Sequence, residues 1–257
     1  MHYSQILRLV KKKNNFAIWR TLFRHHSLAH IKQETMEHHI VSILEINDVT
    51  HNVKRFKIEK PAGYSFIPGQ ATEVSVNKPG MEKEKRPFTF TSLNEYPYLE
   101  FTIKRYADHN GVTNQLHQLQ PGDELILRDV WGVIAYKGPG YFIAGGAGIT
   151  PFIAIIRQLN KDGKLQGNKL LFANKTEADI IYKNELSSML GNDFINILSG
   201  DDTGGYLHGH IDEAFLKKQI PYFNTHFYVC GPDKMISEIN DILVKNGAHP
   251  ESVVFEK

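Results

Sequence analysis

The sequence predicts a small antiparallel β domain, a barrel or a sandwich, followed by an α/β domain with a parallel sheet. Short strands with turn residues between them fill residues 39–133, and strand and helix patterns alternate after residue 140. The glycine-rich stretch at residues 141–151 is typical of the turn between a buried strand and a helix. A chain of 257 residues has room for two domains, each with its own core.

Composition limits the classes of function. A hydrophobic content of 41% and a charged content of 23% are typical of a globular protein. The single cysteine, Cys230, excludes an internal disulfide framework and any iron–sulfur cluster ligated by cysteines of this chain alone. It favours a reducing compartment, so we expect a cytoplasmic protein. The 13 histidines include adjacent pairs such as His25-His26 but no zinc-type spacing, so no metal site is predicted.

The N-terminal residues 1–36 differ from the rest of the chain. They carry a net charge of +6, whereas the remainder has 23 basic and 27 acidic residues, a distribution that argues against a nucleic-acid binder. Aromatic residues recur at helical spacing from Phe16 to Phe23, without the length of a membrane span. Four alternatives stay open: an amphipathic helix for a membrane surface or partner, an organellar presequence, a disordered tail, or a true start at Met36.

Residues 37–137 carry the pattern of an antiparallel β domain. Apolar and polar residues alternate at residues 73–76 and 99–104, as in half-buried strands. Turn-forming pairs such as Pro121-Gly122 separate such segments. Further elements are expected as strands at residues 39–46 and 53–59 and a helix at residues 112–119.

Residues 138–257 carry the rhythm of a parallel α/β domain, which begins after the turn at Lys137-Gly138-Pro139-Gly140. The expected strands are at residues 141–144, 169–173, 194–198, 226–229 and 252–255. The expected helices are at residues 150–159, 180–190, 211–218 and 232–246. Three glycines stand where helices should end: Gly163, Gly191 and Gly247.

The glycine-rich turn is the strongest local motif. Gly145, Gly146 and Gly148 permit a tight turn, Thr150 is a candidate cap of the next helix, and Pro151 suits its first turn. Backbone amides at such a helix start can bind a phosphate. The motif departs from the common dinucleotide fingerprint, because Pro151 stands where the third glycine would fall. By itself it fits a plain strand–helix connection equally well.

Four segments in order resemble the ferredoxin–NADP reductase superfamily. They are Phe66-Ile67-Pro68-Gly69-Gln70, Arg86-Pro87-Phe88-Thr89-Phe90-Thr91-Ser92, the glycine-rich turn, and Tyr228-Val229-Cys230-Gly231-Pro232. The resemblance covers residues 37–257. It implies a flavin-binding Greek-key β-barrel followed by a pyridine-nucleotide domain.

The resemblance implies FAD as the bound cofactor, with FMN as the alternative. Arg86 would contact the flavin phosphates, Phe88 would lie against the isoalloxazine, and Thr89 would lie near its reactive edge. These roles suit a guanidinium fork, an aromatic plane and a hydroxyl. Phe88 stands where the family usually has tyrosine. The implied flavin contacts are Arg86, Pro87, Phe88, Thr89, Gly111, Val112 and Thr113.

The resemblance also implies a site for NADH or NADPH. The implied nucleotide contacts are Gly145, Gly146, Gly148, Thr150, Pro151, Lys175, Tyr182, Cys230, Gly231 and Pro232. Cys230 would lie beside the nicotinamide, and Tyr182 would either stack on adenine or be a core aromatic. Glu256 resembles the acid of the family's final segment, and Thr89, Cys230 and Glu256 are the expected residues of the hydride step.

The implied activity is transfer of a hydride from NAD(P)H to flavin, and then of electrons to a separate acceptor. Ferredoxin, flavodoxin, a haem protein and an oxygenase component are all acceptors of this family. Residues 170–177 resemble the cytochrome b5 reductase branch, which prefers NADH. The alternative is an electron-relay or regulatory subunit without turnover, although such relatives carry a cysteine cluster that this chain lacks. Peripheral membrane contact through residues 1–36 stays open.

Overall fold

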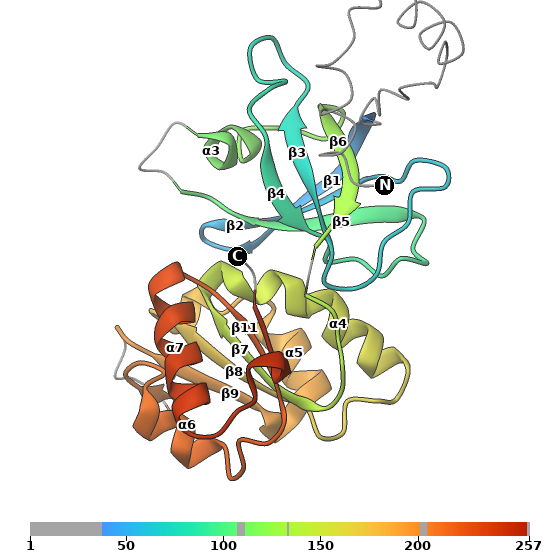
Figure 1. Cartoon of the computed structure of the whole chain (residues 1–257). Helices are drawn as coiled ribbons and strands as arrows, with labels where there is room; N and C mark the ends of the chain where they lie inside the picture. The colour runs from blue at the N-terminus through green and yellow to red at the C-terminus, as the bar shows by residue number, and fades with distance from the viewer. Residues whose placement is uncertain (1–37, 107–110, 133, 201–204, 256–257) are drawn as a thin grey trace, which may run out of the picture. The chain divides into compact units, whose positions relative to one another are not determined.

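The structure is a computed structural model that describes residues 38–106, 111–132, 134–200 and 205–255 (Figure 1). The chain divides into two units, Met1–Glu37 and His38–Lys257. The predicted extension at residues 1–36 and the predicted Glu256 therefore lie outside the described residues. Within the described part, no helix has both the length and the hydropathy needed to cross a membrane.

The first domain is an antiparallel barrel, coloured blue to green in Figure 1. Its strands are β1 (His39–Thr50), β2 (Val53–Glu59), β3 (Ala71–Val76), β4 (Arg86–Thr89), β5 (Tyr98–Lys104) and β6 (Glu124–Trp131), with the short helix α3 (Val112–Leu116). They pair in the order β4-β3-β6-β1-β2-β5. A bridge between Phe90 and Phe101 joins the continuation of β4 to β5 and so brings the two edges together.

Strand β5 is more buried than its alternating sequence predicts. The pattern predicts that Glu100 and Thr102 face solvent, yet both are buried. The reason is tertiary, because these side chains contact Arg157 and Tyr182 of the second domain. The apolar side chains of the same strand, such as Phe101, point into the barrel core.

The second domain is a six-stranded parallel sheet, whose later elements are yellow to red in Figure 1. Its strands are β7 (Gly140–Gly145), β8 (Lys169–Asn174), β9 (Phe194–Leu198), β10 (Leu207–His208), β11 (His226–Cys230) and β12 (Val253–Phe255). Their order in the sheet is β10-β9-β8-β7-β11-β12. The helices are η1 (Gly146–Ile149), α4 (Thr150–Lys161), η2 (Glu177–Asp179), α5 (Lys183–Leu190), η3 (Gly191–Asp193), α6 (Glu213–Gln219), α7 (Asp233–Lys245) and η4 (Pro250–Ser252).

Each face of this sheet has its own apolar core. Phe142 of β7 packs with side chains of α4 and α5, whereas its neighbour Ile143 packs with side chains of α6 and α7. Successive side chains of a strand point to opposite faces, so helices on both faces require strands that are apolar throughout. The sheet is therefore doubly wound, which confirms the predicted α/β class.

Some predicted boundaries differ from those in the structure. The helix predicted at residues 180–190 begins only at Lys183, because Ile180 is extended, Ile181 lies in a turn, and Tyr182 takes a left-handed conformation with φ of 52°. The helix predicted at 112–119 ends at Leu116. Thr150 does not cap α4: it is the first helical residue, and its Oγ1 donates to the Ala147 carbonyl at 3.1 Å.

Candidate nucleotide and flavin site

The sheet order of the second domain reverses between β7 and β11. The chain leaves β7 to form β8 and β9 on one side and later returns to form β11 and β12 on the other. Cys230 at the end of β11 is in register with Ala144 near the end of β7. In open parallel sheets, ligands bind outside the carboxyl ends of the strands at such a reversal. Topology alone thus places a site beside residues 145–148 and 230–232.

A cleft of about 1600 Å³ lies at this position. It is lined by most of the predicted nucleotide contacts, namely Gly145, Gly146, Gly148, Thr150, Lys175, Cys230, Gly231 and Pro232. Pro151 is buried in the first turn of α4 behind it. Barrel residues complete the wall, among them Lys104 at the end of β5 and Tyr106 two residues later. The volume exceeds the roughly 300–1,000 Å³ of small-molecule sites, as a dinucleotide requires.

The glycines allow direct packing of backbone on backbone. A Cβ atom added at Gly148 would lie 2.4 Å from the carbonyl oxygen of Cys230 and 2.5 Å from its carbonyl carbon. A Cβ atom at Gly145 would lie 2.4 Å from Sδ of Met235. Gly146 has a φ of 52°, which favours glycine. The turn is therefore shaped by packing, and it leads directly into the N-terminus of α4, where the helix dipole and amides favour an anion.

Asn174, at the end of β8, has unmet hydrogen-bonding capacity in the same cleft. The residue is only 8% exposed, and neither Nδ2 nor Oδ1 has a hydrogen-bond partner among the described residues. A buried amide without partners costs about 1–3 kcal/mol, which a ligand can recover by bonding to it. Lys104 Nζ also lies 4.0 Å from the position of a Cβ added at Gly146. Amide, cation and glycine turn together fit the ribose hydroxyls and phosphates of a pyridine dinucleotide.

Neither Asn174 nor Lys104 was predicted as a contact. Both are polar residues at the carboxyl end of a strand, and that position is the signal by which Asn174 could have been found. Lys104 could not have been found in this way, since its strand belongs to the other domain.

Cys230 is both a core residue and part of the cleft wall. It ends β11, is 5% exposed, and packs in the cluster that contains Phe172 and Tyr228. A small, polarizable side chain here lets a flat ring approach the end of the strand closely. Its predicted partner in the hydride step, Glu256, lies outside the described residues, so the pairing stays a prediction.

The predicted flavin residues lie on the barrel. Arg86 and Phe88 are two residues apart on β4, which is paired with β3. Their side chains therefore lie on the same face of the strand. Arg86 is exposed, and its Nη1 donates to the neighbouring Lys85 carbonyl at 2.8 Å. Phe88 is half-buried against the barrel core, and Thr89 is buried. An exposed guanidinium on the same strand face as a half-buried aromatic ring fits a flavin nucleotide, and the individual contacts stay predictions.

The second predicted flavin element is the start of α3. Gly111 is the N-cap residue, and among the described residues no side chain accepts a capping hydrogen bond there. Val112 is buried in the barrel core, and Thr113 is half-buried. Val112 therefore anchors the helix, while Gly111 and Thr113 stay accessible for the predicted contact with the flavin pyrophosphate.

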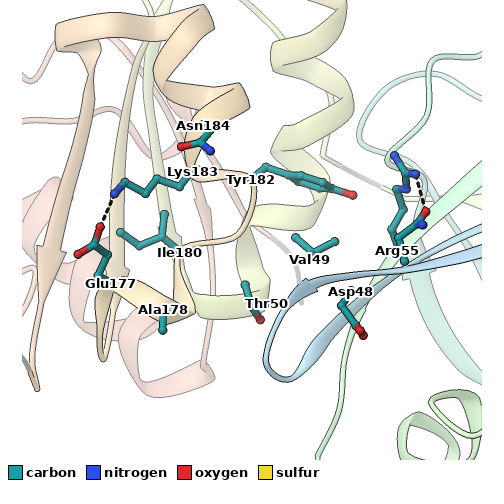
Figure 2. Close-up of a pocket in the computed structure, with 11 residues that line it drawn as sticks. Asp48, Val49, Thr50, Arg55, Glu177, Ala178, Ile180, Tyr182, Lys183 and Asn184 are labelled. Atoms are coloured by element: carbon teal, nitrogen blue, oxygen red, sulfur yellow. Dashed lines mark hydrogen bonds and ion pairs between the residues drawn. The ribbon is translucent and has the colours of Figure 1, made fainter.

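Tyr182 lies outside the cleft that holds the other nucleotide residues. Figure 2 shows its ring directed from the second domain towards the barrel, beside a pocket of about 640 Å³ that Val49 and Arg55 also line. Its hydroxyl is 3.0 Å from Oγ1 of Thr102. Burial, and then the charge of Glu100, raise the pKa of Tyr182 to about 12, so the phenol stays protonated. The structure thus gives Tyr182 a role in the domain contact, and its adenine contact stays a prediction.

In a comparison with known proteins, each of the two domains matches a family model of its own. Residues 41–136 match the family model of the oxidoreductase FAD-binding domain, and residues 142–241 match that of the oxidoreductase NAD-binding domain. NADH-cytochrome b5 reductase 1 of Emericella nidulans is 30% identical over 218 residues, which are 75% of this chain and 69% of that protein.

Another relative belongs to an oxygenase system. The reductase component of propane 2-monooxygenase from Rhodococcus jostii is 24% identical over 232 residues, 84% of this chain and 62% of that protein. NADH-cytochrome b5 reductase 2 of Mycosarcoma maydis is 27% identical over 223 residues, 77% of this chain and 63% of that protein. The chain thus spans less than two thirds of the length of these two relatives.

Solved structures share the fold. A ferredoxin NADP⁺ reductase from Neisseria gonorrhoeae, with bound FAD and NADP, has a TM-score of 0.75 at 18% identity, covering 85% of this chain and 98% of that one. The FAD/NAD-binding domain of a Vibrio cholerae nitric oxide dioxygenase has a TM-score of 0.75 at 20% identity. The match covers 84% of this chain and 97% of that one. Fold, domain matches and relatives together confirm the predicted resemblance: the chain belongs to the ferredoxin–NADP reductase superfamily, with an FAD-binding barrel followed by an NAD-binding domain.

Proposed function

We propose that this protein is a flavin-dependent oxidoreductase that accepts a hydride from NADH and passes electrons to a separate acceptor. The observation that carries the proposal is the composition of the large cleft. Its walls come from both domains: the glycine turn and Cys230 on one side, and barrel residues such as Asn52 and Lys104 on the other. A dinucleotide held by the turn would therefore lie against the domain that binds the flavin.

The side chains act by binding and orientation. A bound flavin supplies the redox chemistry, which the protein alone lacks. The amides after β7 hold the nucleotide phosphates, Arg86 holds those of the flavin, and Phe88 supports the flavin ring. Cys230 sets how closely the nicotinamide approaches, because it forms the wall at the end of β11. No base or nucleophile is needed for such a transfer, and the geometry requires only that two rings meet.

The nucleotide preference is proposed to be NADH over NADPH. A 2′-phosphate needs cations around it, usually an arginine. After β8 the cleft offers Lys175, but also Asp179, whose Oδ2 accepts hydrogen bonds from the Thr176 amide and hydroxyl. Glu177 nearby forms an ion pair with Lys183, whose hydrogen bond lowers the pKa of Glu177. Two carboxylates at this loop would repel a dianion.

Steady-state kinetics with both nucleotides test the preference. We expect kcat/KM to be at least about tenfold higher for NADH, equivalent to about 1.4 kcal/mol. A value tenfold higher for NADPH would contradict the role given to Asp179 and Glu177.

The acceptor is proposed to be a redox protein. Relatives are named for reduction of cytochrome b5 and for an oxygenase system, whose acceptors are proteins.

The proposed location is the cytoplasm, because a chain with a single cysteine suits a reducing compartment. Contact of residues 1–36 with a membrane surface is the alternative location, and association of the full-length chain with anionic liposomes would support it.

Turnover without a partner tests the proposed function. Purified protein should contain flavin and oxidise NADH with ferricyanide as a one-electron acceptor. Protein that holds flavin but does not oxidise NADH would instead indicate an electron-relay or regulatory subunit.

A further inference from the structure

A buried arginine joins the two domains. Arg157 lies in the middle of α4, and its side chain is 13% exposed. Its Nη1 donates to Oε1 of Glu100 and to the carbonyl oxygen of Thr91, both at 2.6 Å. Both of these acceptors belong to the barrel. On its other edge, Nε and Nη2 donate to the two carboxylate oxygens of Glu185, at 2.6 and 2.9 Å.

The groups around Arg157 form one connected cluster. The Glu100 side chain is only 4% exposed, and its Oε1 also accepts a hydrogen bond from the Thr91 hydroxyl at 2.9 Å. That hydroxyl lies 3.1 Å from Oγ1 of Thr102, which contacts the hydroxyl of Tyr182. The Tyr182 ring lies against the guanidinium, with its centroid 5.0 Å from the central carbon. Charge-assisted hydrogen bonds in a buried site are short and strong, so the cluster holds its members in one arrangement.

The guanidinium of Arg157 stays positively charged. Burial alone would lower the pKa of Arg157, but the hydrogen bond with Glu185 and the charges of Glu100 and Glu185 raise it above its usual value. Two carboxylates therefore face one permanent cation. Only a planar fork can bond to a carboxylate on each edge in this way, which a lysine ammonium cannot do.

Arg157 and its barrel acceptors lie a short distance along the chain from both halves of the site. Helix α4 begins at Thr150, directly after the glycine turn, and Arg157 lies seven residues further, about 10 Å along the helix axis. In the barrel, Thr91 follows Thr89 by two residues, about 7 Å along an extended chain. The Thr91 amide donates to the carbonyl of Glu100 at 2.8 Å, so both barrel acceptors belong to one paired segment.

We propose that Arg157 is a positioning residue that sets the distance and angle between the nucleotide-binding turn and the flavin-binding strand, through Glu100 and the Thr91 carbonyl. The proposal rests on the proposed function, since it concerns the contact of two rings that Arg157 itself does not touch. Transfer between the rings depends on alignment, and a misplacement of about 1 Å can cost about 100-fold in rate. Most of the expected nucleotide contacts belong to the second domain and the expected flavin contacts to the barrel, so both affinities should change less than the rate.

Anaerobic stopped-flow reduction of the full-length holoprotein by NADH separates these effects. In Arg157→Gln and Glu100→Gln, we expect the limiting rate of flavin reduction to fall about 10- to 100-fold, while the Kd for NADH changes less than about threefold. Arg157→Lys should be intermediate, because it keeps the charge and loses the fork.

Two matched controls isolate the contact with the barrel. Glu185→Gln neutralises the other carboxylate of the same arginine, but Glu185 lies on α5 within the nucleotide domain. Lys161→Gln breaks a pair with Glu95 that also joins α4 to the barrel, but this pair is exposed. Both variants should keep the limiting rate within about threefold of the wild type.

Three outcomes would overturn the proposal. Unchanged limiting rates in Arg157→Gln and Glu100→Gln, with a normal wild type, would remove the positioning role alone. An equal loss of rate in Leu216→Ala, a core variant in α6 with a comparable fall in melting temperature, would show a merely structural effect. A wild type that NADH does not reduce would overturn the proposed function together with this inference. If Arg157→Gln does not fold, Glu100→Gln and Arg157→Lys decide the question.

Discussion

The two halves of the site are built in different ways. The nucleotide half is a backbone structure: Gly148 lies directly against the carbonyl of Cys230, and neither Gly145 nor Gly148 has room for a side chain. The flavin half presents side chains on a strand, where Arg86 is exposed and donates a hydrogen bond to the adjacent carbonyl of Lys85. One half is fixed by packing of the sheet and helix, whereas the other presents an exposed side chain.

Because of this difference, the two halves should respond differently to amino-acid substitution. A change in a close-packed backbone disturbs the fold and the site together, because the surrounding atoms cannot move far. A change in an exposed side chain disturbs affinity and leaves the fold intact. Substitutions in the two halves should therefore differ in whether stability and binding change together.

The largest expected effect is that of Gly148→Ala. The added Cβ would overlap the Cys230 carbonyl, so we expect a loss of about 3 kcal/mol in the free energy of unfolding and no measurable reduction by NADH. Thermal unfolding and NADH titration measure both. The matched substitution in the flavin half, Gly111→Ala, should keep the fold, because no atom of the residues that the structure describes lies within 4 Å of its added Cβ. Equal stability of the two variants would remove the contrast between the halves.

Arg86→Ala should weaken flavin binding without unfolding the protein. Loss of a charge-assisted phosphate contact costs about 1.5–3 kcal/mol, or about 10- to 150-fold in affinity. The melting temperature of the apoprotein should stay unchanged, because Arg86 is exposed. Flavin content after gel filtration gives the answer, and full retention would exclude the phosphate role.

Cys230→Ala should slow flavin reduction by up to about 100-fold while flavin binding stays normal. The residue is also part of the core, so a modest loss of stability accompanies the change. Anaerobic stopped-flow reduction and thermal unfolding distinguish the two roles. A lower melting temperature with an unchanged rate would leave Cys230 as a core residue only.

The smallest effect is expected from removal of residues 1–36. The compact unit begins at His38, so flavin binding and NADH oxidation with an artificial acceptor should both remain. Gel filtration and steady-state kinetics of the truncated chain measure them. Loss of flavin would show that the barrel needs residues before its first strand.

Local patterns were sufficient for most of the strands and helices, and most of the predicted nucleotide contacts line the large cleft. The glycine turn and the Cys230 segment lie far apart in sequence but each follows a strand, and parallel strands bring their carboxyl ends together. The three predicted helix-ending glycines all have positive φ, namely Gly163, Gly191 and Gly247.

The features that the sequence could not predict are those that arise from contacts between the two domains. Glu100 has the spacing of an exposed strand residue, and only the second domain explains its burial. Arg157 lies among apolar residues of α4 and belongs to no motif. Tyr182 was placed in a helix, but the burial of Ile180 and Ile181 before it requires a turn there instead. These positions are decided by partners distant in sequence, which no local pattern records.

The central claim is that the two halves meet closely enough for a hydride to pass between their ligands. Anaerobic titration of the purified, flavin-containing protein with NADH tests it most directly. We predict that one equivalent of NADH per flavin bleaches the flavin absorbance without any added partner. Retention of the oxidised flavin spectrum at excess NADH, with bound nucleotide shown by calorimetry, would contradict it.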